Sequence, residues 1–402
     1  THSWKSFTAH EINKVLGREG EVGMKESYDH MIRNEAAYHA VVRYVLENPA
    51  KGKLENWKWV GLGSSGVSPD FPPKPNQREA EITLDQRAAE TTFTQVKSLD
   101  PPYPDVKALI EHGGFVLPAD AIQGSKWTLA DKDTLARLRK MEASGIPLGE
   151  YVKGKIYYGI KTGFNEAFVI DGAKRAELIQ QDPRSAEIIK PLAVGDDVRR
   201  WRINKKDKWL IFTRRGNNID AYPAIKKHLL AFKRELEPRP ADWEKQNPGK
   251  KWPGRKPGSY KWYEIQDDIA YYAEFDKPKI VFQEIATFQR FAWDAGGTYV
   301  NNKVFLLPGA DLFLLGILNS QTAWTYLGFL CGTMIAGAYA LQSVYMERLP
   351  VPRASDADRD AIAALVQKCL DAKAADPAAD VSCWEAEIDA IVERLYFGEK
   401  PS

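Results

Sequence analysis

The chain has 402 residues and carries 56 Lys or Arg against 54 Asp or Glu, so its formal net charge is only +2. This length exceeds a single compact core and predicts two or three structural units. The near-zero total charge excludes neither acidic nor basic partners, because only its distribution along the chain can do that. The three cysteines, Cys331, Cys369 and Cys383, form no CxxC pair, which argues against a zinc site and favours a reducing, cytoplasmic compartment.

The first 120 residues are predicted to form a small helical unit followed by a linker. Thr8 with Glu11 makes a capping-box pair, and an apolar stripe at helical spacing ends at Asn48-Pro49, so residues 1–59 are expected to be helical. Glycine, serine and proline then dominate Gly61 to Asn76 and disfavour regular structure. Residues 60–120 are therefore predicted to be a linker and a partly irregular segment.

Residues 121–352 alternate between helix and strand patterns, which predicts a mixed α+β domain. Thr128 to Met141 has apolar residues at helical spacing. Short strands are predicted at Ile156–Ile160, Ala167–Ile170, Trp209–Phe212, Ile280–Glu284 and Lys303–Leu307.

Residues 312–402 are predicted to be largely helical. Leu312–Asn319 and Thr322–Leu330 are expected to be buried helices, and the polar residues and glycines between them argue against a membrane span. The prolines of Arg348–Pro352 end the domain. Residues 353–402 keep apolar positions at helical spacing and are predicted to form C-terminal helices.

Positive charge is concentrated between Arg199 and Lys261, where nineteen Lys or Arg face only six Asp or Glu. A polyanionic partner is the natural inference, although a solvated surface is the alternative for any basic run. Guanidinium groups, amides and aromatic rings lie together in three short segments, and such groups neutralise phosphates and contact base edges. The candidate DNA-binding residues there are Arg199, Arg200, Arg202, Arg214, Arg215, Asn217, Asn218, Lys250, Lys251, Arg255 and Lys256. Lys245 to Gly258 is expected to be a long loop that becomes ordered on a duplex.

Six short motifs follow one another between residues 159 and 352. Gly159 to Ile170 spells G-x-x-T-G-x-N-x-A-F-x-I, and the others are Lys190-Pro191-Leu192 with Gly195 to Val198, Tyr222 to Leu229, Lys279 to Glu284, Leu315 to Ser320 and Leu349 to Pro352. In this order the motifs resemble the TaqI-like C-terminal specificity domain of type IIG and other adenine-N6 DNA methyltransferases. The resemblance extends over residues 120–397, approximately.

The resemblance implies double-stranded DNA as the partner and target recognition as the role. In the first motif, Gly159 and Gly163 are expected to permit a tight turn, and Phe168 is expected to lie in the core. Lys161, Thr162 and Asn165 lie in the turn itself and are further candidate DNA contacts. The recognised base sequence is not predicted.

Intact members of that family carry a methyltransferase domain that binds S-adenosylmethionine and holds the target adenine with an Asn/Asp-Pro-Pro-Tyr loop, and we interpret this chain as lacking it. Gly61 to Gly66 matches GxGxxG, but a proline-rich coil follows where the cofactor-binding helix should begin. Asp100, Pro101, Pro102 and Tyr103 spell the catalytic tetrapeptide without an upstream cofactor motif, so an ordinary turn is favoured. No cofactor is expected in this chain. The alternative is that Asp100 to Tyr103 methylate adenine while a partner chain supplies the cofactor site.

A different resemblance covers residues 1–59. Trp4 to Asn13, Lys25 to His30 and Tyr44 to Pro49 are similar to the C-terminal part of REP-associated tyrosine transposases. In that family the tyrosine matching Tyr28 attacks a DNA phosphate, assisted by a metal held by a His-hydrophobic-His pair. The pair is absent here, so the segment is interpreted as an inert remnant without a metal. The alternative is a single-strand DNA processor that uses Tyr28.

The sequence as a whole therefore predicts a DNA-recognition module rather than a self-sufficient enzyme. Its expected role is the specificity part of an adenine-N6 DNA methyltransferase or restriction-modification protein. A separate methyltransferase chain is the protein partner that this interpretation allows.

Overall fold

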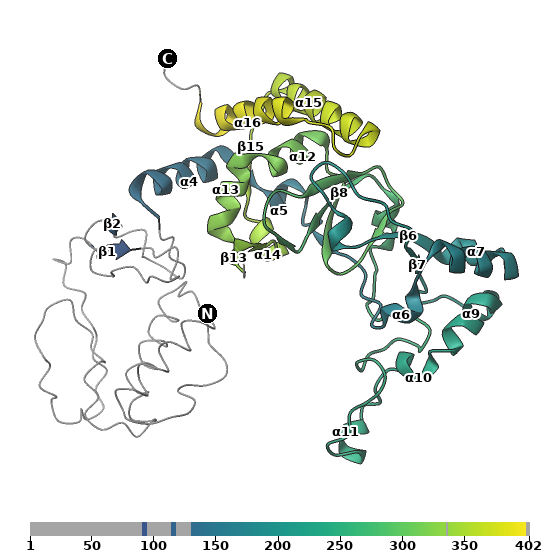
Figure 1. Ribbon diagram of the computed structural model, residues 1–402. Helices are drawn as coiled ribbons and strands as arrows, with labels where there is room; N and C mark the ends of the chain where they lie inside the picture. The colour runs from purple at the N-terminus through teal and green to yellow at the C-terminus, as the bar shows by residue number, and fades with distance from the viewer. Residues whose placement is uncertain (1–90, 95–113, 118–129, 335–336, 399–402) are drawn as a thin grey trace, which may run out of the picture. The chain divides into compact units, whose positions relative to one another are not determined.

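The computed structural model describes residues 91–94, 114–117, 130–334 and 337–398 (Figure 1). The chain divides into two compact units, Thr1–Arg137 and Leu138–Ser402. The described part of the first unit contains an antiparallel strand pair, β1 (Thr91–Thr94) and β2 (Gly114–Leu117), and the start of helix α4 (Lys132–Ser144). Tyr28, the GxGxxG segment, Asp100 to Tyr103 and the helices predicted for residues 1–59 lie outside the described residues.

The second unit contains both helices and strands, which confirms the α+β class. Its strands are β3 (Gly145–Pro147), β4 (Tyr157–Tyr158), β5 (Val169–Ile170), β6 (Ile189–Ala193), β7 (Trp209–Ile211), β8 (Lys279–Gln283), β9 (Ile285–Ala286), β10 (Phe291–Asp294), β11 (Tyr299–Val300), β12 (Val304–Pro308), β13 (Gly332–Thr333), β14 (Tyr339–Ala340) and β15 (Pro350–Pro352). Its helices are α5 (Leu148–Tyr151), α6 (Asn165–Phe168), α7 (Gly172–Gln181), α8 (Ser185–Ile188), α9 (Pro223–Leu230), α10 (Lys233–Leu236), α11 (Trp243–Gln246), α12 (Leu312–Asn319), α13 (Gln321–Leu330), α14 (Ser343–Met346), α15 (Asp356–Ala375) and α16 (Ser382–Phe397), with 3-10 turns at η2 (Gly195–Asp197), η3 (Ile219–Ala221) and η4 (Tyr272–Asp276).

Two four-stranded sheets organise this unit. The first has the order β10-β8-β12-β4, with antiparallel neighbours throughout. The second has the order β11-β6-β7-β5, in which β11 and β6 are parallel. The predicted strands of the first sheet are confirmed to within a residue or two, since β8 and β12 overlap the ranges expected from sequence.

The first sheet separates two hydrophobic cores, because successive residues of a strand point to opposite faces. Ile280 and Phe282 of β8 belong to a core formed with α12, α13, α15 and α16, whereas Val281 between them belongs to a core formed with β6, β7 and α9. Strand β12 divides in the same way, with Leu307 in the first core and Leu306 in the second. The continuous apolar runs of both strands are therefore explained by burial on both faces.

The C-terminal helices complete the first core instead of forming an appendage. Ile362 and Val366 of α15 are fully buried with the residues of α12, and the Tyr396 hydroxyl of α16 donates to the main-chain oxygen of Pro350. Figure 1 shows α15 and α16 lying beside α12. Within the described ranges, no helix combines the length and the apolarity needed to cross a membrane.

One predicted strand is largely wrong. The range Ala167–Ile170 was expected to be extended, but Asn165–Phe168 forms helix α6 and only Val169–Ile170 forms strand β5. The Thr162 hydroxyl donates to Asn165 Oδ1 over 2.7 Å and accepts from the Phe164 amide over 3.2 Å. These local side-chain bonds stabilise a tight turn that leads directly into a helical turn, and the strand pattern does not report them.

Candidate nucleic-acid interface

Arg255 is the best-connected cation of the basic region, and it is buried. Only 4% of the residue is exposed, and its guanidinium donates to the main-chain oxygens of residues that are far apart in sequence. The acceptors are the oxygens of Leu236 (2.8 Å), Thr162 (2.9 Å), Glu264 (2.7 Å), Lys261 (3.3 Å) and Trp262 (2.9 Å). Burial lowers the pKa of Arg255 to about 10, so it stays charged at neutral pH. Arg255 is thus a scaffold residue, in contrast to its predicted place among the DNA contacts.

The turn of the first motif is held against this guanidinium. The Thr162 oxygen accepts from Arg255 and from the Gln266 amide, and the Thr162 side chain is buried. Gly163 has a φ of +84°, which favours glycine, as the turn prediction required. Gly159 has a different reason, because a Cβ there would lie 2.2 Å from the Asn301 main-chain oxygen. Thr162 is therefore a structural residue, whereas the side chain of Asn165 is exposed and that of Lys161 is half-buried.

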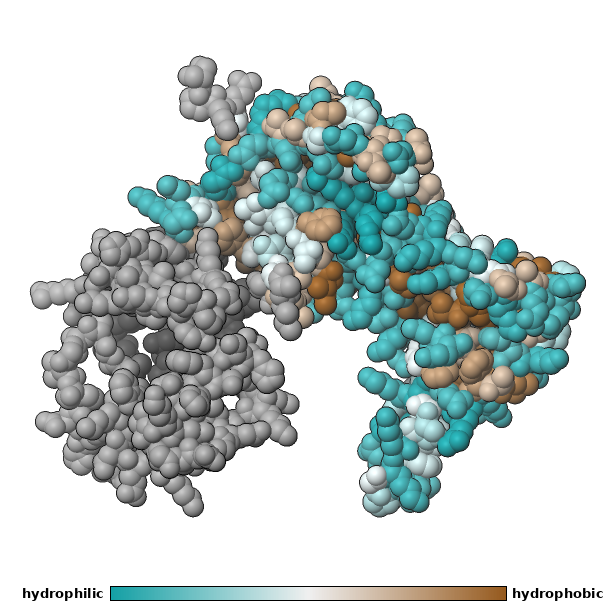
Figure 2. All heavy atoms as spheres, in the orientation of Figure 1, coloured by the Kyte–Doolittle hydropathy of each residue, from teal (hydrophilic) through white to brown (hydrophobic). Residues whose placement is uncertain are grey.

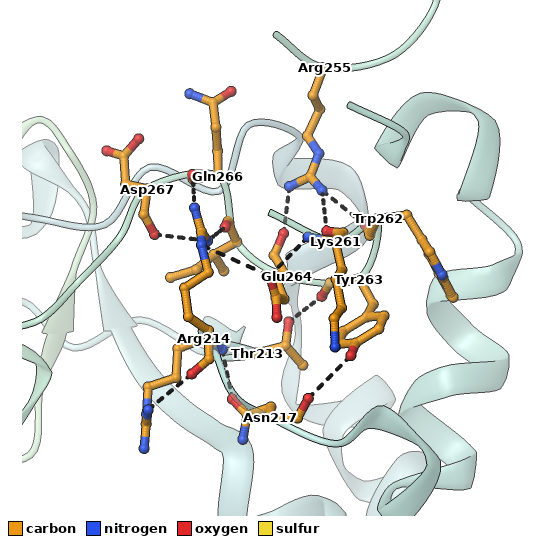
Figure 3. A network of polar contacts seen from close by, with 12 residues as sticks. Thr213, Arg214, Asn217, Arg255, Lys261, Trp262, Tyr263, Glu264, Gln266 and Asp267 are labelled. Atoms are coloured by element: carbon orange, nitrogen blue, oxygen red, sulfur yellow. Dashed lines mark hydrogen bonds and ion pairs between the residues drawn. The ribbon is translucent and has the colours of Figure 1, made fainter. Parts of the chain in front are cut away.

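A second turn, Arg214 to Asn218, bonds to the same 261–267 loop as the first (Figure 3). Asn217 caps it by accepting from the Arg214 amide over 2.7 Å, and the Asn218 side chain accepts from the Asp220 amide at the start of η3. Arg215 is used internally, since it donates to the main-chain oxygens of Ile265, Gln266 and Asp267. Arg214 instead lies over the Tyr272 ring, 4.0 Å from the ring centroid. The two turns and the 261–267 loop therefore converge, as the sequence alone did not indicate.

The third arginine cluster lies elsewhere, on the turn from Arg199 to Arg202. Trp201 at its centre is buried and has a φ of +73°, and its indole donates to Glu385 of α16 over 2.6 Å. Arg200 pairs with the same carboxylate at 2.9 Å and donates to the Asn319 main-chain oxygen. Arg200 is consequently a bridge between this turn and the C-terminal helices. Arg199 and Arg202 remain half-buried beside it, and the only side-chain bond recorded for either within the described ranges joins Arg199 to the Val198 oxygen.

Residues 233–256, which we call the arm, carry several of the exposed cations of the region. The arm extends beyond α9 in Figure 1 and is covered by hydrophilic side chains in Figure 2. It is folded: the Trp243 and Trp252 rings meet at 4.7 Å, and the Arg255 amide donates to the Glu237 oxygen over 3.0 Å. The segment that was expected to be a loop is therefore closed at its base by the bond between Arg255 and Glu237, and it contains a short helix, α11. Lys250, Lys251 and Lys256 are exposed on it, and none has an acidic partner in the part of the chain that the structure describes.

Aromatic residues near the first two turns were missed by the sequence analysis. Tyr157 and Tyr271 stack at 4.3 Å, and the Tyr271 hydroxyl donates to the Tyr158 oxygen over 2.7 Å. Burial raises the pKa of Tyr271 well above its usual value, so the phenol stays neutral and can keep donating. Tyr158 is exposed at the edge of this stack. Local sequence gave no signal for the stack, because its members come from β4 and from the loop before η4.

The same region offers no metal centre. Within the described residues, no group of three or more His, Cys, Asp or Glu side chains could hold a metal ion.

One family model and two solved structures are similar to parts of this chain. Residues 190–351 match the family model of the TaqI-like C-terminal specificity domain. Among solved structures, a type IIL restriction-modification enzyme, MmeI, in complex with DNA is similar at 14% identity and a TM-score of 0.44, over 62% of this chain and 33% of that one. The type IIG restriction endonuclease BpuSI is similar at 11% identity and a TM-score of 0.39, over 71% of this chain and 36% of that one. The chain thus spans about a third of the length of these solved chains. The family match does not include residues 1–59, whose transposase resemblance stays a prediction. The match to the TaqI-like C-terminal specificity domain thus covers residues 190–351, which is less than half of the chain.

Proposed function

We propose that the second unit recognises double-stranded DNA. The proposal rests on one observation about the domain that matches the specificity family: some of its cations are bonded within the fold and others are exposed. Arg255, Arg215 and Arg200 bond to main-chain oxygens or to a partly buried carboxylate, whereas Lys250, Lys251 and Lys256 are exposed without acidic partners among the described residues. Lysines of this kind can release condensed counterions from a phosphate backbone, so they supply affinity without sequence preference.

Sequence preference would come from the neighbouring turns. Lys161, Asn165, Arg214 and Asn218 combine donors and acceptors on short, hydrogen-bonded turns, and such turns fix side chains in register with base edges. Arg214 is held flat by Tyr272 at 4.0 Å, which lowers the entropy that it would lose on contacting a guanine. These four residues are the ones we assign to base readout.

We further propose that this recognition serves an adenine-N6 DNA methyltransferase or a restriction-modification protein. The described residues provide recognition, and methyl transfer would need an S-adenosylmethionine site in another domain or in a separate methyltransferase chain. This part of the proposal rests on the family match and on the order of the motifs.

Binding to a randomised duplex pool, followed by sequencing of the bound fraction, tests the proposal. We expect a preferred site and an affinity that falls on the order of a thousandfold between 50 and 200 mM salt, if about six phosphates are contacted. Binding that ignores salt, or an affinity weaker than about 100 micromolar at low salt, would contradict it. A parallel assay with labelled S-adenosylmethionine should show no methyl transfer by the chain alone. Incorporation into adenine that Tyr103→Ala abolishes would favour the alternative in which Asp100 to Tyr103 are catalytic.

A further inference from the structure

Phe288 stands out on the surface of the second unit. It lies in the turn between β9 and β10 and is 45% exposed, although a phenyl ring gains nothing from water. Ile285, Phe329, Met334 and Val344 are also exposed. Large exposed apolar side chains are candidate contacts for a binding partner.

The surroundings of Phe288 are cationic. The Arg290 guanidinium lies 4.2 Å from the centroid of the Phe288 ring, and its Nη1 donates to Gln283 Oε1 over 3.1 Å. Gln283 in turn donates to the Gly195 oxygen, which fixes the position of Arg290. The Nε of Arg290 is buried and has no hydrogen-bond acceptor among the described residues, so this guanidinium keeps an unused donor.

Two further arginines adjoin the same turn. The Trp201 amide donates to the Phe291 oxygen over 3.0 Å, and Trp201 forms a β-bridge with Ala292. This pairing places the Arg199–Arg202 turn alongside the end of the β9–β10 turn. The Phe288 ring is thus bordered by the guanidinium group of Arg290, and the turn that carries Arg199 and Arg202 pairs with the strand that follows Phe288, a combination that suits a polyanion with an apolar interior.

We propose that Phe288 is a wedge that contacts base pairs in a DNA groove while the three arginines neutralise the flanking phosphates. The inference rests on the proposed function and deepens it, by naming a contact outside the basic run. Apolar wedges of this type pack against thymine methyl groups or partly unstack a base step, and positive charge beside them offsets the backbone repulsion of a compressed groove. A neutral duplex mimic lacks the phosphate charge, and a lipid surface lacks stacked bases. Neither therefore offers both features that the wedge and the arginines would contact.

The chain provides its own control for the proposal. Val344 on α14 is 58% exposed and lies on a different element from Phe288. If exposed apolar side chains contribute to binding in general, Val344→Ser and Phe288→Ala should act alike. If Phe288 is a DNA wedge, only Phe288→Ala should act on DNA binding.

Affinity for the duplex selected from the randomised pool is measured for the full chain and for Phe288→Ala, Phe288→Leu and Val344→Ser. We expect Phe288→Ala to weaken binding on the order of tenfold with an unchanged salt slope, because no charge is removed. Phe288→Leu should retain part of the affinity, and Val344→Ser should retain all of it. Unchanged thermal unfolding of each variant shows that folding is intact.

Two results overturn the inference. Equal affinity of Phe288→Ala and the unaltered chain removes the wedge and leaves the proposed function standing. An equal loss of duplex affinity in Val344→Ser assigns the effect to exposed apolar side chains in general and not to a wedge at Phe288. If the unaltered chain itself binds no duplex, the proposed function fails first, and the wedge fails with it.

Discussion

The Arg255 guanidinium donates to the main-chain oxygen of Thr162 over 2.9 Å, across 93 residues of sequence. The same guanidinium holds the oxygen of Leu236 in α10, so one buried cation fixes both the first turn and the base of the arm. The candidate base contacts Lys161 and Asn165 and the candidate phosphate contacts Lys250 and Lys251 therefore depend on a residue that touches no DNA in our proposal.

We predict that Arg255→Met destabilises the protein by about 3 to 5 kcal/mol, because several buried carbonyl oxygens lose a charged donor at once. Urea unfolding measures the change. Lys256→Met is the matched control, since that side chain is exposed and should shift stability by less than about 0.5 kcal/mol. Equal stability of the two variants would show that the carbonyl oxygens find other donors.

Salt dependence tests the arm. Replacing both Lys250 and Lys251 with Gln should reduce the slope of log affinity against log salt by about 2, because each lost phosphate contact retains its counterion. The loss should be similar for all duplex sequences. The control removes two exposed charges elsewhere, with Arg353→Gln and Lys368→Gln, and should leave the slope unchanged. Equal slopes in the two double variants would separate the arm from DNA binding.

The link between Arg200 and Glu385 can be measured by a double-mutant cycle. The pair is partly buried at 2.9 Å, and Glu385 also accepts from Trp201. We expect a coupling free energy of about 1 to 3 kcal/mol between Arg200→Met and Glu385→Gln, from urea unfolding of the four proteins. Additive effects would mean that the turn holds its position without this ion pair.

His228 should make stability depend on pH. Burial lowers the pKa of His228 below its usual value of about 6.5, while its Nε2 bonds with the Ala167 oxygen at 2.9 Å. The unfolded chain therefore binds a proton more readily than the folded one, and the free energy of unfolding falls as pH drops through about 6.5 until the lower folded pKa is passed. His228→Gln keeps a donor for Ala167 but does not titrate. We expect the unaltered protein to lose more stability than this variant between pH 7.5 and 5.5, and parallel losses would argue against a buried neutral imidazole.

The strands and helices of the cores were largely predictable, since their signal is local. Ile280 to Phe282 is a short apolar run, as expected of a strand that is buried on both faces, and Leu312 to Leu318 is apolar all round, as a buried helix should be. Strand β5 was predicted too long because the hydrogen bonds of Thr162 and Asn165 favour a helical turn that hydrophobic spacing does not encode.

The sequence around each arginine did not predict whether its guanidinium would be bonded within the fold or remain available to a partner. Arg214 and Arg215 are adjacent, yet one lies on an aromatic face and the other is tied to three main-chain oxygens. A guanidinium becomes buried where the 261–267 loop places carbonyl oxygens that need a donor. The position of this loop is set by the tertiary fold. Phe288 could not be singled out from the sequence for the same reason. Its exposure and its contact with Arg290 result from the fold.

The pairing of β3 with β15, in which Gly145 faces Pro352, brings the beginning and the end of the intervening segment together. A segment whose ends meet can be spliced into a loop of another protein without spreading the host chain. The transplant should nevertheless continue through α16 to Phe397, since α15 and α16 supply Ile362, Val366 and Ile388 to the core that covers α12. A transplanted segment that ends at Pro352 would expose that face of α12 and aggregate. A segment that ends after Phe397 would keep α12 covered by α15 and α16.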